Sequence, residues 1–350
     1  MELCILTPDE KHGRFLAMKI KAAFLAGPEK IIFHEIDAPP LGTDEVRIRT
    51  VLTGVCGTDI SIYKGHRPTE YPFVLGHEVM GRVAETGAGV TKFRIGDRVI
   101  VEPNYPCSSC VLCRQGRGAV CAHKMAMGVN IQGCFSEYAT APEEFVWHVP
   151  DSISDRDAVT IEPLAVSLQG LFRSGTRPGD SVVVLGCGVV GLLLVHAAVD
   201  MGLRVIAYDL FPEKLVMAQS LGAEIPSNNE DTSEFWARKN VTTVFECAGV
   251  TEAVELALSD APRGAKIVLL GLSPLPATFV PVRIVREGIN ILTSMIYDHP
   301  VDFARAIELI ASGRLRPSIV VTDVYPLSDI NAAMERAASG TSGKVLLEMD

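Results

Sequence analysis

A glycine-rich stretch between residues 181 and 210 constrains the fold more than any other part of the sequence. It opens with an apolar, β-branched run, Val182–Leu185, which is too short for a helix and predicts a buried strand. Apolar residues at helical spacing follow as far as Gly202, and a second strand, Arg204–Tyr208, ends at Asp209. Three glycines spaced G-x-G-x-x-G separate the first strand from the helix: Gly186, Gly188 and Gly191.

This strand–turn–helix–strand unit is typical of a dinucleotide-binding site. The first glycine makes a tight turn, the second lets the backbone approach a pyrophosphate, and the third packs the helix on the strand. The phosphates then lie at the helix N-terminus, where free N–H groups and the helix dipole favour an anion. A glycine triad alone is also compatible with an ordinary tight turn, but the flanking elements favour the cofactor site.

The acidic residue at the end of the second strand indicates which dinucleotide is bound. Asp209 comes 18 residues after Gly191, near the spacing at which a carboxylate meets the ribose hydroxyls of NAD. Because a carboxylate there would repel a 2′-phosphate, NAD is favoured over NADP. The residues that we expect to bind the cofactor are Gly186, Gly188, Val189, Val190, Gly191, Asp209 and Lys214.

Length and composition exclude several classes of protein. The chain has 350 residues, enough for two domains, and its 48% hydrophobic and 21% charged content is that of a globular protein. A net charge of −10 without a basic block counts against nucleic-acid binding, and no apolar run approaches a membrane span. The start of the chain lacks the pattern of a signal peptide, so we expect a cytoplasmic protein in which residues 1–17 are an extension.

Candidate metal ligands occur in the first half of the chain, where short strands with Gly and Pro between them predict a β-rich, barrel-like domain. Cys56 and His77 each follow a short strand and a glycine, and Glu162 lies in the turn-like segment IEPLAVS. A lone Cys or His is more often a packing residue. Thiolate, imidazole and carboxylate together, however, are three ligands that leave a zinc ion one open position, as in catalytic sites.

Four clustered cysteines form a second and more specific pattern. They are spaced C-x2-C-x2-C-x7-C in a loop: Cys107, Cys110, Cys113 and Cys121. Four thiolates suit a closed tetrahedral zinc site that stabilises the loop and binds no substrate. The alternatives are an iron–sulfur cluster, disfavoured by the absence of proline after the last cysteine, and disulfides, disfavoured by the cytoplasmic location.

Beyond residue 170 strands and helices alternate, which predicts a doubly wound parallel sheet. A helix is expected from Pro212 to Gly222, and another after Gly249 with Thr251 as its N-cap. The fourth and fifth strands are expected at Lys266–Leu272 and Asn290–Ile296. The chain end predicts a strand, a helix capped by Ser328 or Asp329, and a last strand, which we expect to return to the first domain.

Taken in order, GVCGTD, LGHE, the four-cysteine loop, EPLAVS, LGCGVVG and FECAG resemble the zinc-containing medium-chain alcohol dehydrogenase superfamily, most closely its sorbitol (polyol) dehydrogenase-like branch. The resemblance implies an α/β protein with a GroES-like β-rich catalytic domain and a Rossmann domain. The expected division is 1–17 extension, 18–170 catalytic domain, 171–305 Rossmann domain, and 306–350 returning to the catalytic domain. The resemblance also implies a homodimer or homotetramer in which the last strands of two Rossmann domains pair across the interface.

The same resemblance assigns roles to residues. Cys56, His77 and Glu162 would hold a catalytic zinc, with Glu78 either entering the coordination shell or lying just outside it. Thr58 would pass the alcohol proton outward, and Asp59 would orient His77. The expected reaction is hydride transfer from a small secondary alcohol, such as a polyol, cyclitol or sugar, to NAD, which gives a ketone and NADH.

Two departures from the family pattern bear on the substrate. Many relatives have a histidine where this chain has Ser61, and His66 is near enough in sequence to substitute. Sorbitol dehydrogenases tend to have an arginine where this chain has Ile296, next to Tyr297, so sorbitol itself is in doubt. The alternatives are a threonine or amino-alcohol dehydrogenase, a non-catalytic zinc-stabilised dinucleotide sensor, and a zinc-free quinone or enoyl reductase, which would have no reason to keep Asp209 or four clustered cysteines.

Overall fold

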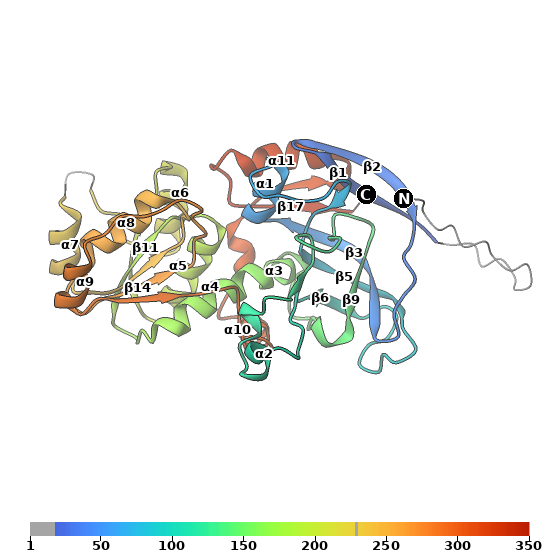
Figure 1. Ribbon diagram of the computed structural model, residues 1–350, viewed down its shortest axis with the longest axis horizontal. Coiled ribbons are helices and arrows are strands. Elements are labelled where there is room, and N and C mark those ends of the chain that lie inside the picture. Colours follow the sequence, from blue (N-terminus) through green and yellow to red (C-terminus); the bar gives the residue numbers. More distant parts are fainter. Residues whose placement is uncertain (1–17, 228–229, 350) are drawn as a thin grey trace, which may run out of the picture.

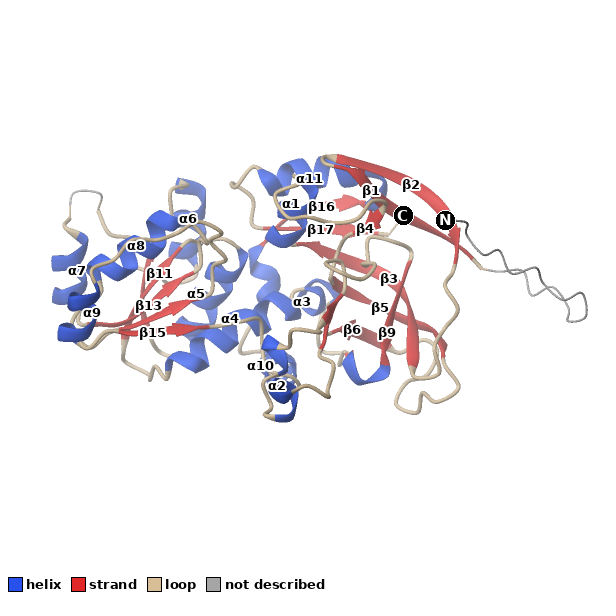
Figure 2. Cartoon of the chain, in the orientation of Figure 1, coloured by secondary structure: helices blue, strands red, loops and turns tan. Residues whose placement is uncertain are grey.

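The computed structural model describes residues 18–227 and 230–349, which form two lobes side by side (Figure 1). The expected extension, residues 1–17, lies outside the described residues. One lobe is mostly strand and the other alternates strand and helix, as Figure 2 shows. No helix within the described ranges is both long and apolar enough to cross a bilayer, and the cytoplasmic location stays a prediction.

The β-rich lobe is built on a seven-stranded sheet with the order β10-β6-β5-β3-β17-β16, in which β9 also pairs with β3. A three-stranded sheet, β2-β1-β4, and a small pair, β7-β8, complete it. Its strands are β1 (Lys19–Gly27), β2 (Lys30–Asp37), β3 (Glu45–Val55), β4 (Phe73–Val74), β5 (Glu78–Thr86), β6 (Arg98–Val101), β7 (Asn104–Tyr105), β8 (Met125–Ala126), β9 (Tyr138–Pro142), β10 (Val146–His148), β16 (Val321–Pro326) and β17 (Lys344–Glu348).

The end of the chain lies in this first lobe, because β17 pairs antiparallel with β3 and parallel with β16. Figure 1 shows these red strands beside the blue N-terminal strands. The helices and 3₁₀ turns of the lobe are α1 (Gly57–Tyr63), α2 (Val111–Arg114), η1 (Gly118–Val120), η2 (Glu143–Phe145), η3 (Pro317–Val320), η4 (Leu327–Asp329) and α11 (Ile330–Ala338). Asp329 occupies the N-cap position of α11, although its side chain makes no capping hydrogen bond.

The second lobe is a five-stranded, fully parallel sheet with the order β12-β11-β13-β14-β15. On the free side of β12, Glu224 forms an isolated parallel bridge with Ile206, in the position of a sixth strand. With this position included, the strand order is that of a Rossmann domain. Its elements are β11 (Ser181–Leu185), α5 (Val189–Asp200), β12 (Arg204–Tyr208), α6 (Pro212–Ser220), α7 (Thr232–Arg238), β13 (Val241–Glu246), α8 (Thr251–Asp260), β14 (Lys266–Leu269), α9 (Pro281–Glu287) and β15 (Asn290–Thr293).

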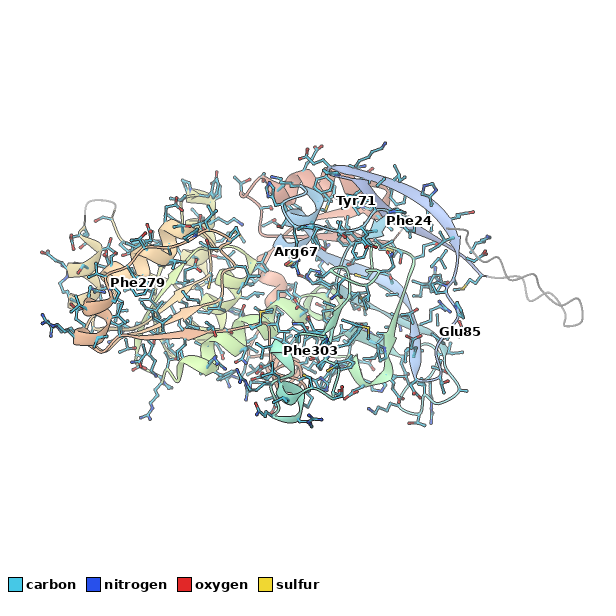
Figure 3. The ribbon with its side chains drawn as sticks, viewed as in Figure 1. Phe24, Arg67, Tyr71, Glu85, Phe279 and Phe303 are labelled. Atoms are coloured by element: carbon cyan, nitrogen blue, oxygen red, sulfur yellow. The ribbon has the colours of Figure 1, made fainter. Side chains whose placement is uncertain are left out.

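Three helices join the lobes: α3 (Asp155–Val159), α4 (Ile161–Ser174) and α10 (Val301–Ala311). Buried side chains of α4, α5 and α10 form one core that continues into both lobes. Phe303 of α10 lies where the lobes meet (Figure 3), stacked on Trp147 of β10. The domain boundaries remain predictions, and the one after residue 305 falls inside α10.

Some local expectations were wrong. Glu162 does not lie in a turn: it is in the first turn of α4, where Pro163 is tolerated because first-turn N–H groups have no intrahelical partner. Thr251 is the first helical residue of α8, not its cap, and Val250 occupies the cap position. The strands β14 and β15 end at Leu269 and Thr293, three residues earlier than predicted in each case; after β14 the N–H groups of Leu270 and Gly271 both bind the Glu246 carbonyl, which ends the strand pairing.

The glycine loop has the geometry that the motif predicts. Gly186 has a φ of 94°, and a Cβ there would lie 2.6 Å from the backbone of Ala248. A Cβ at Gly191 would lie 1.9 Å from the Gly186 carbonyl oxygen, so this glycine lets α5 pack on β11. Gly188 differs, because a Cβ on it would meet nothing within 4 Å. The space beside Gly188 is therefore open to a ligand.

This contrast predicts a large effect on stability for one alanine substitution and a small effect for another. Gly191→Ala should lower the free energy of unfolding of the cofactor-free protein by about 3 kcal/mol, because the methyl group overlaps backbone. Gly188→Ala, whose φ of −66° suits any residue, should change it by less than about 1 kcal/mol. Urea denaturation measures both, and equal losses in the two variants would contradict the packing role of Gly191.

Candidate active site

The candidate zinc ligands Cys56, His77 and Glu78 come together in the β-rich lobe. Their ligand atoms lie within 4.8 Å of one another, and we call them the Cys56 cluster. Cys56 follows β3 and caps α1, while Glu78 opens β5 directly after His77. Because β3 and β5 are antiparallel neighbours with Gly54 opposite Glu78, residues some twenty positions apart meet at one strand end.

Asp59 holds the two ligand-bearing segments together. It is fully buried, and its carboxylate accepts hydrogen bonds from the backbone N–H of Cys56 (2.9 Å) and of Gly76 (3.0 Å). The same carboxylate lies 3.5 Å from His77 Nδ1, as expected for the residue that orients this imidazole. Burial lowers the pKa of His77, but the Asp59 and Cys56 charges outweigh burial and raise it well above its ordinary value. The cluster thus favours a positive charge.

Glu78 is held by a lysine that sequence reasoning missed. Lys344, the first residue of β17, is buried and donates to Glu78 Oε1 (2.6 Å) and to the carbonyl of Val55 (3.1 Å). A lysine at a strand end is usually solvent-exposed, so only the pairing of β17 with β3 reveals this partner. Glu78 also packs against Gly54, where a Cβ would lie 1.9 Å from Oε2.

The second oxygen of Glu78 gives an independent test of metal binding. Oε2 is buried and has no hydrogen-bond partner among the described residues, although a buried carboxylate oxygen is normally paired. Beside it lie one thiol and one imidazole, a donor set that zinc prefers. The residues present therefore fit a zinc ion with an open position.

Glu162 lies outside the Cys56 cluster but belongs to the same electrostatic environment. It is buried in the first turn of α4, and burial raises its pKa to about 7, with Glu78 adding to the effect and His77 opposing it. Of the four predicted catalytic-zinc ligands, the structure thus brings three together in one cluster. Whether Glu162 or Glu78 is the third zinc ligand stays a prediction.

The four cysteines of the second pattern converge on one point. Sulfur–sulfur distances are 3.4 Å between Cys110 and Cys113, and 3.9 Å for both Cys107–Cys113 and Cys110–Cys121. A zinc ion with Zn–S bonds of about 2.3 Å requires sulfurs about 3.8 Å apart. Hydrogen bonds from the backbone and hydroxyl of Ser109 lower the pKa of Cys107 to about 5, which favours the thiolate. The cluster fits a closed structural zinc site.

Most of the predicted cofactor residues lie at the glycine turn around Gly188. Val189 and Val190 form the first turn of α5, and Asp209 Oδ2 accepts a hydrogen bond from the N–H of Cys187 (2.7 Å). Lys214 does not point its ammonium at free space, because it is buried and donates to the carbonyl of Ser342 in the other lobe. Its role in cofactor binding stays a prediction.

The helix α4 connects the two candidate sites directly. Glu162 is near its start, and one and a half turns later Ser167 donates a hydrogen bond to the Val190 carbonyl (2.9 Å) beside the glycine loop. In open α/β sheets ligands bind where the strand order reverses, here between β11 and β13. The predicted zinc ligand Glu162 and a contact to the glycine loop are therefore on one rigid element.

The remaining candidates take different positions. Thr58 is half-buried near the start of α1, and its hydroxyl has no hydrogen bond to another described residue. Ser61 lies one turn later on the same face, whereas His66 is exposed beyond the helix. Tyr297 is buried, and its hydroxyl accepts a hydrogen bond from Asn104 (2.7 Å). Asn104 carries no motif that would have identified it.

Comparison with known proteins shows the family. The model of the alcohol dehydrogenase GroES-like domain matches residues 42–151, and that of the zinc-binding dehydrogenase matches residues 189–312. A sorbitol dehydrogenase of Bacillus subtilis (strain 168) is 33% identical over 330 residues, which cover 91% of this chain and 93% of the relative. The chain belongs to the zinc-containing medium-chain alcohol dehydrogenase superfamily.

Two solved structures of relatives place a dinucleotide on this fold. An alcohol dehydrogenase of Escherichia coli CFT073 complexed with NADH is 29% identical and superimposes with a TM-score of 0.88 over 94% of this chain and 99% of that one. A zinc-binding dehydrogenase of Sinorhizobium meliloti 1021 bound to NADP is 30% identical, with a TM-score of 0.88 over 95% and 99%. The GroES-like and Rossmann domains of this dehydrogenase are thus both established.

The buried pair of Lys344 and Glu78 generates a stability prediction. Lys344→Met should lower the free energy of unfolding of the zinc-loaded enzyme by about 3 to 5 kcal/mol, because it leaves a buried carboxylate without its cation. The double variant Lys344→Met/Glu78→Gln is the matched control and should regain most of the loss. Chemical denaturation measures both, and a double variant no more stable than the single one would contradict the pairing role.

Proposed function

We propose that this enzyme oxidises a secondary alcohol, in a polyol, cyclitol, sugar or similar molecule, to a ketone, with NAD as the hydride acceptor. The observation that carries the proposal is the unpartnered, buried Glu78 Oε2 beside Cys56 and His77. A purely structural site would have no reason to leave a buried carboxylate oxygen without a partner. A non-catalytic sensor of the dinucleotide would not need this cluster.

Different residues would bind the metal, transfer the proton and bind the cofactor. Zinc at the Cys56 cluster would supply Lewis acidity that makes the substrate hydroxyl more acidic, and NAD would accept the hydride. Cys56 and His77 would hold the metal with Glu78 or Glu162, and Asp59 would keep the imidazole oriented through the contacts described above. The free hydroxyl of Thr58 would take the alcohol proton and pass it toward solvent. Gly188 would admit the pyrophosphate.

The choice of cofactor rests on Asp209. Its carboxylate lies at the end of β12, where the adenosine ribose is bound in this fold, and it would repel a 2′-phosphate. The relative bound to NADH supports this choice, while the relative bound to NADP makes a direct comparison of both cofactors necessary. We propose NAD as the physiological acceptor.

A substrate panel tests the proposal. At fixed enzyme concentration, NADH formation is followed over polyols, cyclitols, sugars, simple secondary alcohols and threonine, with NADP run in parallel. We expect turnover of a secondary alcohol with NAD, and its loss after a chelator removes zinc or after Cys56→Ala. Metal analysis should give two zinc ions per chain for the wild type and one for Cys56→Ala, since the four-cysteine site is separate.

The outcomes separate the alternatives. Turnover of threonine alone would identify an amino-alcohol dehydrogenase, and activity that persists without metal would contradict the zinc-dependent reaction. NAD binding by a zinc-loaded enzyme that oxidises nothing across the panel would favour the sensor. Preference for NADP would contradict the role assigned to Asp209.

We also propose that two copies of the chain pair through the edge strand β15. Among the described residues this strand has one neighbour, β14, and residues 272–291, which lead into it and include it, carry several exposed apolar side chains. Figure 3 places one of them, Phe279, on the side of that domain away from the β-rich lobe. The exposed apolar residues are Leu272, Leu275, Phe279, Val280, Val282, Val285 and Ile291. An uncovered edge of this kind favours pairing.

Light scattering tests the assembly. The wild type should have a mass of at least twice the 37.7 kDa of one chain, as a dimer or tetramer. Ile291→Lys in β15 should shift the mass toward the monomer, because it places a charge in the interface. The matched control is Val216→Lys on α6, another exposed apolar position, away from β15 in the sheet order. A monomeric wild type would contradict the proposal.

A further inference from the structure

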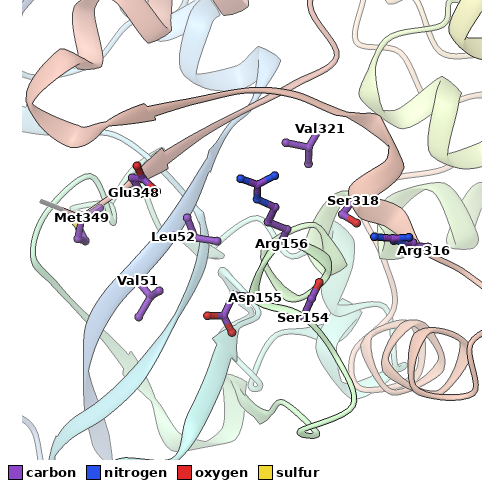
Figure 4. Close-up of a pocket in the computed structure, with 10 residues that line it drawn as sticks. All are labelled: Val51, Leu52, Ser154, Asp155, Arg156, Arg316, Ser318, Val321, Glu348 and Met349. Carbon is purple, nitrogen blue, oxygen red and sulfur yellow. The ribbon is translucent and has the colours of Figure 1, made fainter.

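A cavity of about 590 Å³ lies on the β-rich lobe, separate from the Cys56 cluster and from the cofactor crevice. Its walls come from four parts of the chain: the middle of β3, the start of α3, the segment 316–321 around η3, and the end of the chain at Glu348 and Met349 (Figure 4). None of the predicted site residues lines it. Its volume is within the range of small-molecule sites in proteins.

Two solvent-exposed arginines line the cavity, and they come from different elements. Arg156 belongs to α3 and Arg316 precedes η3. Neither guanidinium has an ion pair or a hydrogen bond to another residue in the part of the chain that the structure describes, in contrast to Arg98 nearby, which binds Asp155 at 2.5 Å. An unpaired guanidinium can bind a planar or tetrahedral anion with paired hydrogen bonds, and this cavity has two such groups in its walls.

The acidic side chains around the cavity do not neutralise the two arginines. Asp155 is held by Arg98, and Asp157 is buried and accepts hydrogen bonds from Ser154 Oγ (2.6 Å) and the Ser318 N–H (2.9 Å). The carboxylate of Glu348, which is solvent-exposed, has no ion pair or hydrogen bond among the described residues. Figure 4 shows it at the opposite end of the cavity from Arg316 and Ser318.

The cavity also occupies a special place in the fold. The chain leaves the β-rich lobe through α3 and α4 and returns to it through the segment 312–321. Arg156 lies on the first connection and Arg316 on the second. The hydrogen bond from the Ser318 N–H to Asp157 joins the same two connections. An anion held by both guanidiniums would therefore link the two connections between the lobes.

We propose that this cavity binds a small phosphate- or carboxylate-bearing anion between Arg156 and Arg316. The site is separate from the proposed function, since it uses neither the metal cluster nor the glycine loop. Its position makes the ligand an effector of the joint between the lobes, not a substrate.

Calorimetric titration of the zinc-loaded enzyme saturated with NAD tests the proposal, with inorganic phosphate and succinate as the two probes. Saturation with NAD blocks the pyrophosphate site, and Cys56→Ala, titrated in the same way, excludes binding at the open zinc. We expect at least one probe to bind. Arg156→Gln and Arg316→Gln should each weaken its binding about tenfold, the effect of losing a charge-assisted hydrogen bond. The probe that binds more tightly shows whether the cavity prefers a phosphate or a carboxylate group.

Two further variants make the result specific. Glu348→Gln should strengthen binding about threefold, because it removes a negative charge that repels the bound anion. Loss of an arginine acts in the opposite direction. Arg263→Gln, an exposed arginine of the Rossmann domain outside the cavity, should change nothing. The proposal is overturned if neither probe binds, if the affinity is equal in the wild type and both arginine variants, or if Cys56→Ala abolishes binding.

Discussion

A buried ion pair, Lys344 with Glu78, is the interaction on which the metal cluster depends. It joins the last strand of the chain to the strand that carries the ligand, because β17 lies next to β3 and β3 next to β5. An uncompensated carboxylate in this place would be costly, and its cation comes from a residue 266 positions away in sequence. The return of the chain to its first lobe is thus a requirement of the site as well as of the sheet.

A second constraint keeps the metal cluster in register with the cofactor crevice. The helix α4 carries Glu162 at one end and is bonded through Ser167 to the backbone of the glycine loop. A shift of the Rossmann lobe along this helix would break that hydrogen bond, and the contact of Lys214 with the Ser342 carbonyl as well. Hydride transfer needs the reacting carbon close to the nicotinamide, so this rigid connection serves the chemistry.

Predictions from sequence succeeded where a short motif reflects a local requirement, such as the geometry of a turn or the chemistry of a metal ligand. The glycine loop, the four cysteines and the Cys56 cluster all follow from short motifs, since turn geometry and ligand chemistry restrict the residue types. Sequence failed where tertiary contacts decide. Lys344 is identified only by strand pairing, and Glu162 is helical because α4 packs along α5 and α10. Nothing in the local sequence marks Asn104 as the partner of Tyr297.

The backbone at Ile296 explains how the Rossmann sheet is connected to the other lobe. A β-branched residue rarely adopts positive φ, yet Ile296 has a φ of 49°. The next three residues each bind a different partner: Tyr297 accepts from Asn104, Asp298 accepts from Gln169, and His299 contacts Glu102 at 2.8 Å. The unusual backbone conformation of Ile296 directs the next three side chains to their partners, and these three polar contacts offset the cost of the strain. An isoleucine at this position presents no hydrogen-bond donor to the joint, whereas an arginine side chain would present five.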